Sequence, residues 1–278
     1  MINLKNIILE VENKWFNKLY NFSKLSFNNC NLPSHDHNHH LRVWYYCKEI
    51  IINNAKKKIF LYSDVENLII ASFMHDIGMT KTLDIIHGIE SGKICDNYFN
   101  SNKIVKPERY LEIIDAIEKH DDKNYKKKQK DSLSTLAILS IADDLDAFGV
   151  IGILRYIEIY YLRDNNIFRM PRDILRNLEK RYANFITKYF YLEEFNKLHT
   201  SRYLKIHNFF SELQNEIEIE SYSSLKKTGA VGFLNIVLCN FIHNNIDIES
   251  FCDLIESKDV YINRVKEILK TELEMHKL

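Results

Sequence analysis

Glycine and proline are scarce in this chain, and this scarcity limits the folds that it can adopt. The 278 residues include only seven glycines and three prolines, against ordinary usage of about 7% and about 5%. Short strands are joined by turns that depend on these two residues, so a fold with many strands is disfavoured. A chain of this length also buries a core without disulfides or a partner. The composition therefore predicts an all-α protein that folds independently.

Charge and cysteine usage restrict the class of partner. The chain has 38 basic and 38 acidic residues, so it lacks the broad positive field that attracts a nucleic-acid backbone. Its five cysteines are scattered without a CxxC pair, and no cleavable signal peptide opens the sequence. We expect a protein of the reducing cytoplasm that does not bind nucleic acid.

One uncharged stretch, residues 229–246, approaches the length of about 18 residues that a membrane helix needs. Asparagines and a histidine interrupt it, and unpaired amides are costly in hydrocarbon. We therefore expect a buried core helix and no membrane partner.

Helical periodicity dominates the first half. Residues 1–30 place aromatic and aliphatic side chains at helical spacing, which predicts an amphipathic helix. Pro33 and Ser34 then form a helix start signal. His39 leads an apolar stripe in the next helix and should point toward the core. The other members of this stripe are Val43, Cys47 and Ile50.

A second helix is apolar all round and ends in a charged residue. Ser63 with Glu66 predicts a capping box, and residues 68–74 follow as expected of a helix buried on every side. His75 and Asp76 end this segment. A carboxylate at the end of a dry helix is costly unless it is paired. A cation or a network of donors must therefore lie beside Asp76.

Two further segments follow. Residues 108–120 predict a helix, and the lysine-rich residues 123–130 predict a solvated loop. Ser134 is expected to cap another helix, on which Asp143 shares a face with core leucines.

Histidine and aspartate recur in three separated segments. Imidazole nitrogen and carboxylate oxygen suit a borderline or hard divalent ion, and no thiol lies among them. The motifs are His35-Asp36-x-x-His39-x-x-Arg42-Val43, His75-Asp76-Ile77-Gly78 and Ala142-Asp143-Asp144-Leu145-Asp146-Ala147. In order and approximate spacing they resemble the HD-domain superfamily of metal-dependent phosphohydrolases, and most of all its small stand-alone bacterial members, over roughly residues 30–160.

The resemblance implies a helical bundle that holds one divalent ion, Mn²⁺, Fe²⁺, Co²⁺ or Mg²⁺. Its ligands would be His39, His75, Asp76 and Asp143. His39 is preferred because it stands three residues before the Arg-Val pair, while His35, His37 and His40 remain alternatives. We expect an HD-type domain over residues 1–160 and a helical C-terminal region over residues 161–278, unless the two form one continuous domain.

Two more histidines, His87 and His120, fall where two-metal members of the superfamily carry extra ligands. Order along the chain is weaker support than spacing, so three roles stay open for each. They could bind a second ion, transfer a proton to or from a substrate, or lie on the surface at a helix end.

The chain also departs from the distal motif expected for the stand-alone group, Asp-Ala-Asp-Arg-Leu-Asp-Ala. Ile141 replaces the first Asp, and Asp144 replaces the Arg. A missing guanidinium removes a candidate bidentate phosphate contact, so the substrate is not carried over. The Lys that often follows His-Asp-Ile-Gly is displaced to Lys81.

The function that the resemblance implies is hydrolysis of a phosphoester or phosphoanhydride of a small molecule, with nucleotides the first class to test. Asp76 would hold the ion and orient water, and His120 or His87 would protonate the leaving oxygen. Arg42 and Lys81 would offset phosphate charge. Two alternatives are a di-iron oxygenase built on the same scaffold and a non-catalytic helical binding module. Self-association stays open.

Overall fold

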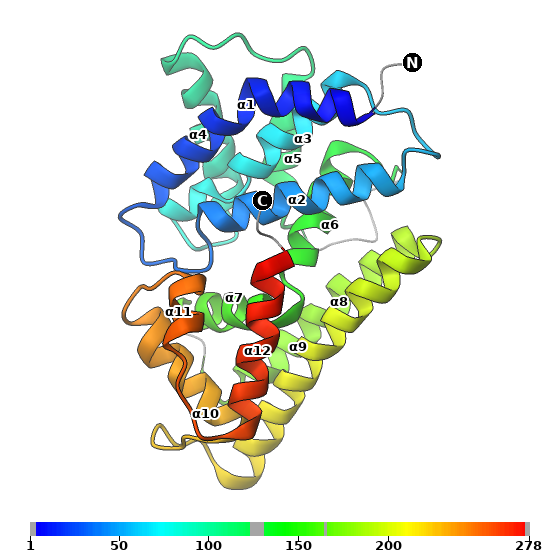
Figure 1. Cartoon of the computed structure of the whole chain (residues 1–278). Helices are drawn as coiled ribbons and strands as arrows, with labels where there is room; N and C mark the ends of the chain where they lie inside the picture. Colours follow the sequence, from blue (N-terminus) through cyan, green and yellow to red (C-terminus); the bar gives the residue numbers. More distant parts are fainter. Residues whose placement is uncertain (1–3, 123–130, 164–165, 276–278) are drawn as a thin grey trace. The chain divides into compact units, whose positions relative to one another are not determined.

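The structure, a computed structural model, describes residues 4–122, 131–163 and 166–275 (Figure 1). Every regular element in these ranges is a helix, so the predicted all-α fold class is confirmed. The lysine-rich segment 123–130, predicted to be a solvated loop, lies outside the described residues.

The chain divides into two compact units. The first consists of Met1–Cys30 and His35–Leu145, and the second of Asn31–Ser34 and Asp146–Leu278. The division at residue 160 that the sequence suggests stays a prediction.

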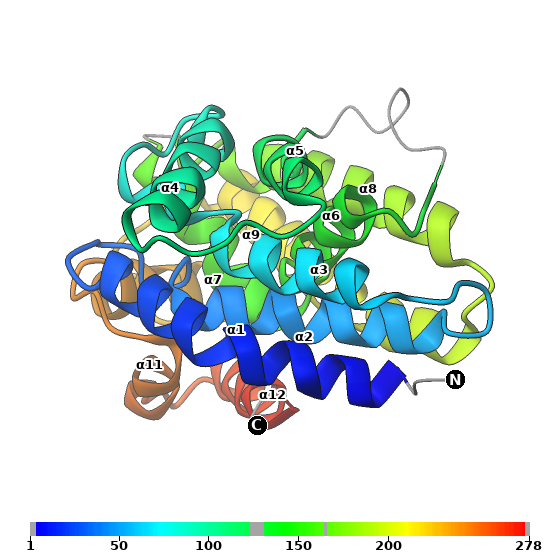
Figure 2. The ribbon, with the colours of Figure 1, turned by 90° about the horizontal axis from the view of Figure 1, so that it is seen from above.

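Helix α3 is the centre of the first unit. It contacts α1, α2, α4 and α5, and Figure 2 shows α1 and α2 side by side with α3 next to both. Its residues from Asp64 to Met74 are all buried, which agrees with the apolar pattern of its sequence. The elements of this unit are α1 (Leu4–Phe27), α2 (His37–Asn53), α3 (Tyr62–Met74), the 3₁₀ turn η1 (Ile77–Thr80), α4 (His87–Ser101), α5 (Tyr110–Lys119) and α6 (Thr135–Asp146).

The start of α2 differs from the predicted one. Asp36 is the N-cap: its Oδ1 accepts the backbone N–H groups of Asn38 at 3.0 Å and of His39 at 3.1 Å. The start signal at Pro33 and Ser34 was therefore placed too early, because a carboxylate three residues before His39 satisfies the free N–H groups of the first turn.

The predicted capping box of Ser63 and Glu66 is wrong. Helix α3 begins at Tyr62 with Leu61 as its N-cap, so Ser63 already lies within the first turn, and the Asp64 carboxylate accepts the backbone N–H of Leu61 at 2.9 Å. Glu66 is buried, and its Oε1 accepts the indole N–H of Trp15 at 2.8 Å. The Glu66 carboxylate thus links α3 to α1. It binds the buried indole N–H of Trp15 and does not cap the start of its own helix.

The second unit is built around α9, which contacts α7, α8 and α10. Figure 1 shows α8 and α9 as a long antiparallel pair. None of the described helices is long and apolar enough to cross a membrane. The elements are α7 (Gly149–Leu162), α8 (Met170–Tyr189), α9 (Glu193–Glu220), α10 (Gly229–Ile236), the π-helical turn η2 (Val237–Ile242), α11 (Ile248–Leu254) and α12 (Val260–Met275).

A carboxylate from the last helix caps the start of α7. Glu272 of α12 is buried, and its Oε2 accepts the backbone N–H groups of Val150 at 2.8 Å and of Ile151 at 3.2 Å. Gly149 has a φ of +80°, and a Cβ placed there would lie 2.4 Å from Oε1 of Glu272. Only glycine fits this position, because both the backbone conformation and the approach of the carboxylate exclude a side chain.

Candidate metal centre

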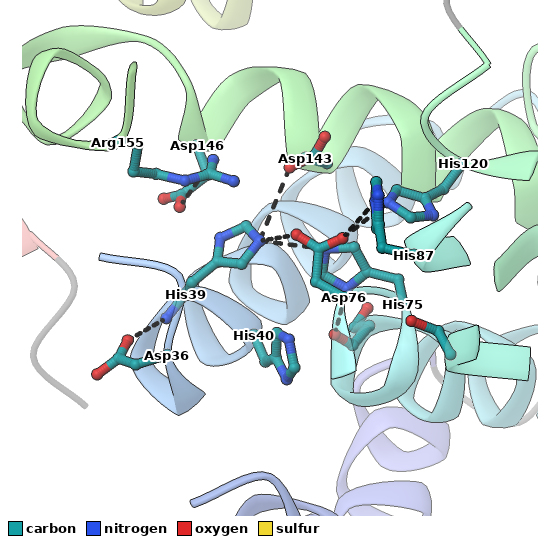
Figure 3. Close-up of polar contacts among 12 residues, drawn as sticks. Asp36, His39, His40, His75, Asp76, His87, His120, Asp143, Asp146 and Arg155 are labelled. Atoms are coloured by element: carbon teal, nitrogen blue, oxygen red, sulfur yellow. Dashed lines mark hydrogen bonds and ion pairs between the residues drawn. The ribbon is translucent and has the colours of Figure 1, made fainter. Parts of the chain in front are cut away.

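Five helices of the first unit bring histidine and aspartate side chains to one buried place. His39 lies in the first turn of α2, and Asp143 lies on α6. The others come from the end of α3 and just beyond it, the start of α4 and the end of α5. In Figure 3 these side chains gather around the carboxylate of Asp76. Each is at most 4% exposed, and the set is His39, His75, Asp76, His87, His120 and Asp143.

The first group consists of the four predicted ligands, His39, His75, Asp76 and Asp143. Each offers one ligand atom, and these atoms all lie within 4.8 Å of one another. Nε2 of His39 is 3.3 Å from Oδ2 of Asp76 and 3.7 Å from Oδ1 of Asp143. Nε2 of His75 is 3.6 Å from the same Oδ2. Two imidazole and two carboxylate groups thus converge from three parts of the chain.

The second group consists of Asp76, His87 and His120, whose ligand atoms also lie within 4.8 Å of one another. Nε2 of His120 is 2.9 Å from Oδ1 of Asp76, and Nε2 of His87 is 3.3 Å from it. Asp76 therefore belongs to both groups, with Oδ2 facing the first and Oδ1 facing the second. A carboxylate in this position can bridge two cations.

Backbone carbonyl groups orient three of the histidines in the same way. In each of the three, Nδ1 donates to the carbonyl of the residue three positions earlier. For His75 the acceptor is the carbonyl of Ser72, at 2.9 Å. Since a carbonyl oxygen only accepts, Nδ1 carries the proton, and Nε2 is left to face the site. The other two pairs are His87 with the carbonyl of Asp84 at 2.9 Å and His120 with that of Ile117 at 2.7 Å.

The orientation of these imidazole rings indicates whether the site suits a metal ion. With Nδ1–H already donating, the short contact between Nε2 of His120 and Asp76 requires a second ring proton or a cation between the two atoms. In the first group, Nε2 of His39 and Nε2 of His75 lie 3.1 Å apart. Two lone pairs at this distance repel each other unless a proton or a cation lies between them. Buried imidazole and carboxylate donors without a thiol fit a divalent ion.

The electrostatics of the site follow from burial and from Asp76. Burial alone would raise the pKa of Asp76, but His75 and the imidazoles that bond the carboxylate hold this pKa well below its ordinary value. Burial is also the largest influence on His75 and lowers the pKa of this imidazole to about 3. For His87, burial acts in the lowering direction, but the bond to Asp76 outweighs it and raises the pKa to about 9. A permanent carboxylate thus lies among the imidazoles.

The three alternative histidines lie outside both groups. His35 is buried, with its ring centre 5.7 Å from that of His39. His37 packs edge-on against Tyr20, with ring centres 5.2 Å apart. His40 is buried, and its Nδ1 lies 2.7 Å from the hydroxyl oxygen of Ser23. His39 alone of the four contributes to the first group.

The two predicted phosphate contacts differ in exposure. Arg42 lies on α2, one turn after His39, and is buried. Lys81 directly follows η1 and is exposed, with its backbone N–H bonded to the carbonyl of Gly78. A role for either residue with a substrate stays a prediction.

Two supporting residues were not singled out from the sequence. The hydroxyl of Ser140 on α6 donates to the carbonyl of His120 at 3.0 Å, and the backbone N–H of Gly78 donates to the hydroxyl of Ser91 at 2.8 Å. A Cβ at Gly78 would lie 2.0 Å from the carbonyl oxygen of His87. In the sequence, the glycine after His-Asp-Ile was the only indication of this close packing. Ser91 and Ser140 could not be recognised, because a buried serine on a helix has the pattern of an ordinary core residue.

Comparison with known proteins gives one match. The family model of the HD domain matches residues 37–147. This segment contains every residue of the two groups, and it ends two residues beyond the end of the first unit at Leu145. No curated protein and no solved structure matches the chain.

Proposed function

The chain belongs to the HD superfamily through residues 37–147, and from this membership we propose that it is a phosphohydrolase whose metal centre is the pair of groups that share Asp76. The observation that carries this proposal is the convergence of five buried side chains on the carboxylate of Asp76. A hydrolase centre needs a cation, a fixed carboxylate and groups that handle protons beside it. Residues of the first unit supply the carboxylate and the imidazoles, and these side chains would hold the cation.

The ligands that we propose follow the two groups. One divalent ion would be held by the first group, and a second ion by the second group with Asp76 as the shared ligand. Mn²⁺, Fe²⁺, Co²⁺ and Mg²⁺ are the ions to test, because the donors are nitrogen and oxygen only. All five cysteines are free, which agrees with the reducing cytoplasm that we propose as the location.

Different residues of the two groups would perform different steps of the hydrolysis. A bound divalent ion lowers the pKa of water and polarises a phosphoryl oxygen. Asp76, held as a carboxylate, fixes the position of the reacting groups. If only the first group is occupied, a proton on Nε2 of His120 is available to the leaving oxygen. If both groups are occupied, His87 and His120 act as ligands instead, and the leaving oxygen takes its proton from solvent.

We propose nucleotides as the first substrate class, with Arg42 and Lys81 as the residues that offset phosphate charge. Both follow a ligand closely in the sequence: Arg42 stands three residues after His39, and Lys81 stands five residues after Asp76. Because the guanidinium expected in the distal motif is replaced by Asp144, the contacts to the phosphate should differ from those of the stand-alone group.

Release of inorganic phosphate tests the proposal. The wild-type chain, loaded with Mn²⁺, is screened against nucleoside mono-, di- and triphosphates beside an Asp143→Asn variant. The matched control is Asp253→Asn, which changes an exposed carboxylate in the second unit. We expect turnover by the wild type and the control, and a loss of about 100-fold or more in Asp143→Asn because the first group loses a charged ligand. Equal rates in all three proteins would refute the proposal.

The second group favours one further candidate. Two irons that share a carboxylate would suit oxidative cleavage of a small substrate, which the same scaffold could perform. Oxygen uptake by iron-loaded protein, without phosphate release, would select this function. A chain that takes up no metal at all would select the non-catalytic binding module.

A further inference from the structure

A cavity of about 960 Å³ lies within the second unit. Its walls are the connection between α9 and α10 and the connection between α11 and α12, and its floor is formed by α10 and η2. None of its lining residues belongs to the two metal groups. Pockets for small molecules have volumes of about 300–1,000 Å³, so this cavity is large enough for a ligand of nucleotide size.

The first wall is fastened to α10 by one side chain. Asn235 is 9% exposed, and its amide Nδ2 donates to the carbonyls of Ser223 and Lys226, both at 2.9 Å. Its Oδ1 accepts the hydroxyl of Tyr222 at 2.9 Å. Three bonds to one amide hold this connection in place.

The second wall is fastened to α12. Nζ of Lys266 donates to the carbonyl of Ile255 at 2.7 Å, and Nδ2 of Asn263 donates to the carbonyl of Ser257 at 3.0 Å. Both connections are therefore held by side chains of neighbouring helices. The cavity exists before any ligand arrives, which lowers the cost of binding.

The floor contains a π-helical turn. Val237–Ile242 form η2, and its members Cys239 and Asn240 are exposed and line the cavity. Such turns are rare, and they occur frequently at functional sites. Ile236 adds an apolar surface beside them.

The lining of the cavity contains three lysines and two carboxylates. Lys226 lies 3.0 Å from Glu216 and also pairs with Glu220. Lys227 comes from the first wall and Lys258 from the second, and both are exposed. Across the described residues, neither of these two side chains has a hydrogen bond or ion pair.

Two carboxylates also line the cavity. Oδ1 of Asp259 accepts the backbone N–H of Ile262 at 3.0 Å at the start of α12, where the helix dipole offsets part of the carboxylate charge. The other is Glu256, which is exposed. Among the described residues, the ammonium groups of Lys227 and Lys258 are thus unpaired, and Glu256 is the exposed carboxylate of the lining.

We propose that this cavity is a binding site for a small organic anion with an apolar body. Lys227 and Lys258 hold the anionic head, and the apolar body lies against Ile236 and Val260. The exposed thiol of Cys239 is covered when the ligand is bound. The site lies beyond the proposed phosphohydrolase function, since it shares no residue with the metal groups.

The probe for the experiment is 8-anilinonaphthalene-1-sulfonate, an organic anion with an apolar body. Its binding is followed by fluorescence, and its location by the rate at which iodoacetamide alkylates Cys239, measured by peptide mass spectrometry. We expect saturable binding and a decrease of about 10-fold or more in the alkylation rate of Cys239. Cys30, which is partly exposed on the first unit, should react at an unchanged rate. A probe that leaves the Cys239 rate unchanged would overturn the proposal.

Charge variants test the role of the lysines. Lys258→Glu should weaken the protection of Cys239 about 10-fold, and Glu256→Gln should strengthen it, because the two changes alter the local charge in opposite directions. Lys56→Glu is the matched control, since Lys56 is an exposed lysine of the first unit. Lys227→Glu repeats the test from the other wall if Lys258→Glu does not fold. Equal protection in the lysine variants and the control would contradict the proposal.

Discussion

Nε2 of His120 lies 2.9 Å from Oδ1 of Asp76, on the side of the carboxylate that faces away from His39, whose Nε2 lies 3.3 Å from Oδ2. The two oxygens of one side chain therefore serve two different sets of imidazoles. This division makes the occupancy of the two groups separable by mutation.

His87→Gln and His120→Gln should each remove the second ion and leave the first. Each histidine contributes only to the group on the Oδ1 side of Asp76, and loss of one ligand lowers affinity by about 10–100-fold or more. For a wild-type chain that binds two ions, the metal content per chain, measured by plasma mass spectrometry, should fall from two ions toward one in each variant. His207→Gln, a change in the second unit, is the control. Loss of both ions would show that the two groups are not separable in this way.

Gly78→Ala should destabilise the first unit and disturb His87. A Cβ there would meet the carbonyl oxygen of His87 at 2.0 Å and the backbone nitrogen of Ser91 at 2.6 Å. Backbone atoms cannot move aside cheaply, so the free energy of unfolding should fall by about 1–3 kcal/mol. Urea unfolding measures this change. A variant as stable as the wild type would mean that η1 and α4 do not approach so closely.

The cap of α7 should show coupling between Gly149 and Glu272. Gly149→Ala introduces a side chain at positive φ and against the carboxylate, which should lower the free energy of unfolding by about 1–3 kcal/mol. In a Glu272→Ala background the clash is absent and only the backbone strain remains, so Gly149→Ala should cost less. A double-mutant cycle by urea unfolding measures the difference. If the effects of Gly149→Ala and Glu272→Ala on the free energy of unfolding are additive, the contact between these two residues is contradicted.

Asp64 should contribute to stability in a pH-dependent way. Burial alone would raise its pKa, but the backbone N–H of Leu61 and the side chains of Arg109 and Lys58 outweigh burial and lower it below 3.8. Its contribution is thus present above pH 3.8 and is lost as the pH falls through the folded-state pKa. The difference in unfolding free energy between wild type and Asp64→Asn should be constant near neutral pH and should shrink below pH 3.8. A difference that does not change with pH would contradict the ion pair, and Asp253→Asn should show no such loss.

Much of the fold and the membership of the first group, the four side chains that could hold a metal ion, could be predicted from the sequence. Scarce glycine and proline favour helices. The resemblance to the HD superfamily, in which the first His stands three residues before an Arg-Val pair, implies His39 among the four neighbouring histidines. The apolar run before His75 also indicates a buried helix with a carboxylate at its end. These patterns depend on residues close together in the sequence, so contacts with distant segments do not alter what they predict.

Other features depend on contacts between distant segments. Ser63 and Glu66 have the spacing of a capping box, but Trp15 on another helix binds the carboxylate of Glu66. The order of His87 and His120 along the chain left three roles open, and only the approach of both rings to Oδ1 of Asp76 distinguishes a buried site from a helix end. Such choices depend on tertiary distances that residue spacing does not encode.

Metal content of the wild type and of Asp76→Asn, after loading with Mn²⁺ and removal of free ion, tests the central claim most directly. Asparagine keeps the size of the side chain but removes the charge that both groups share. The account predicts one or two ions per wild-type chain and essentially none in Asp76→Asn, with the helical content unchanged by circular dichroism. Equal metal content in the two folded proteins would contradict a metal centre built on Asp76.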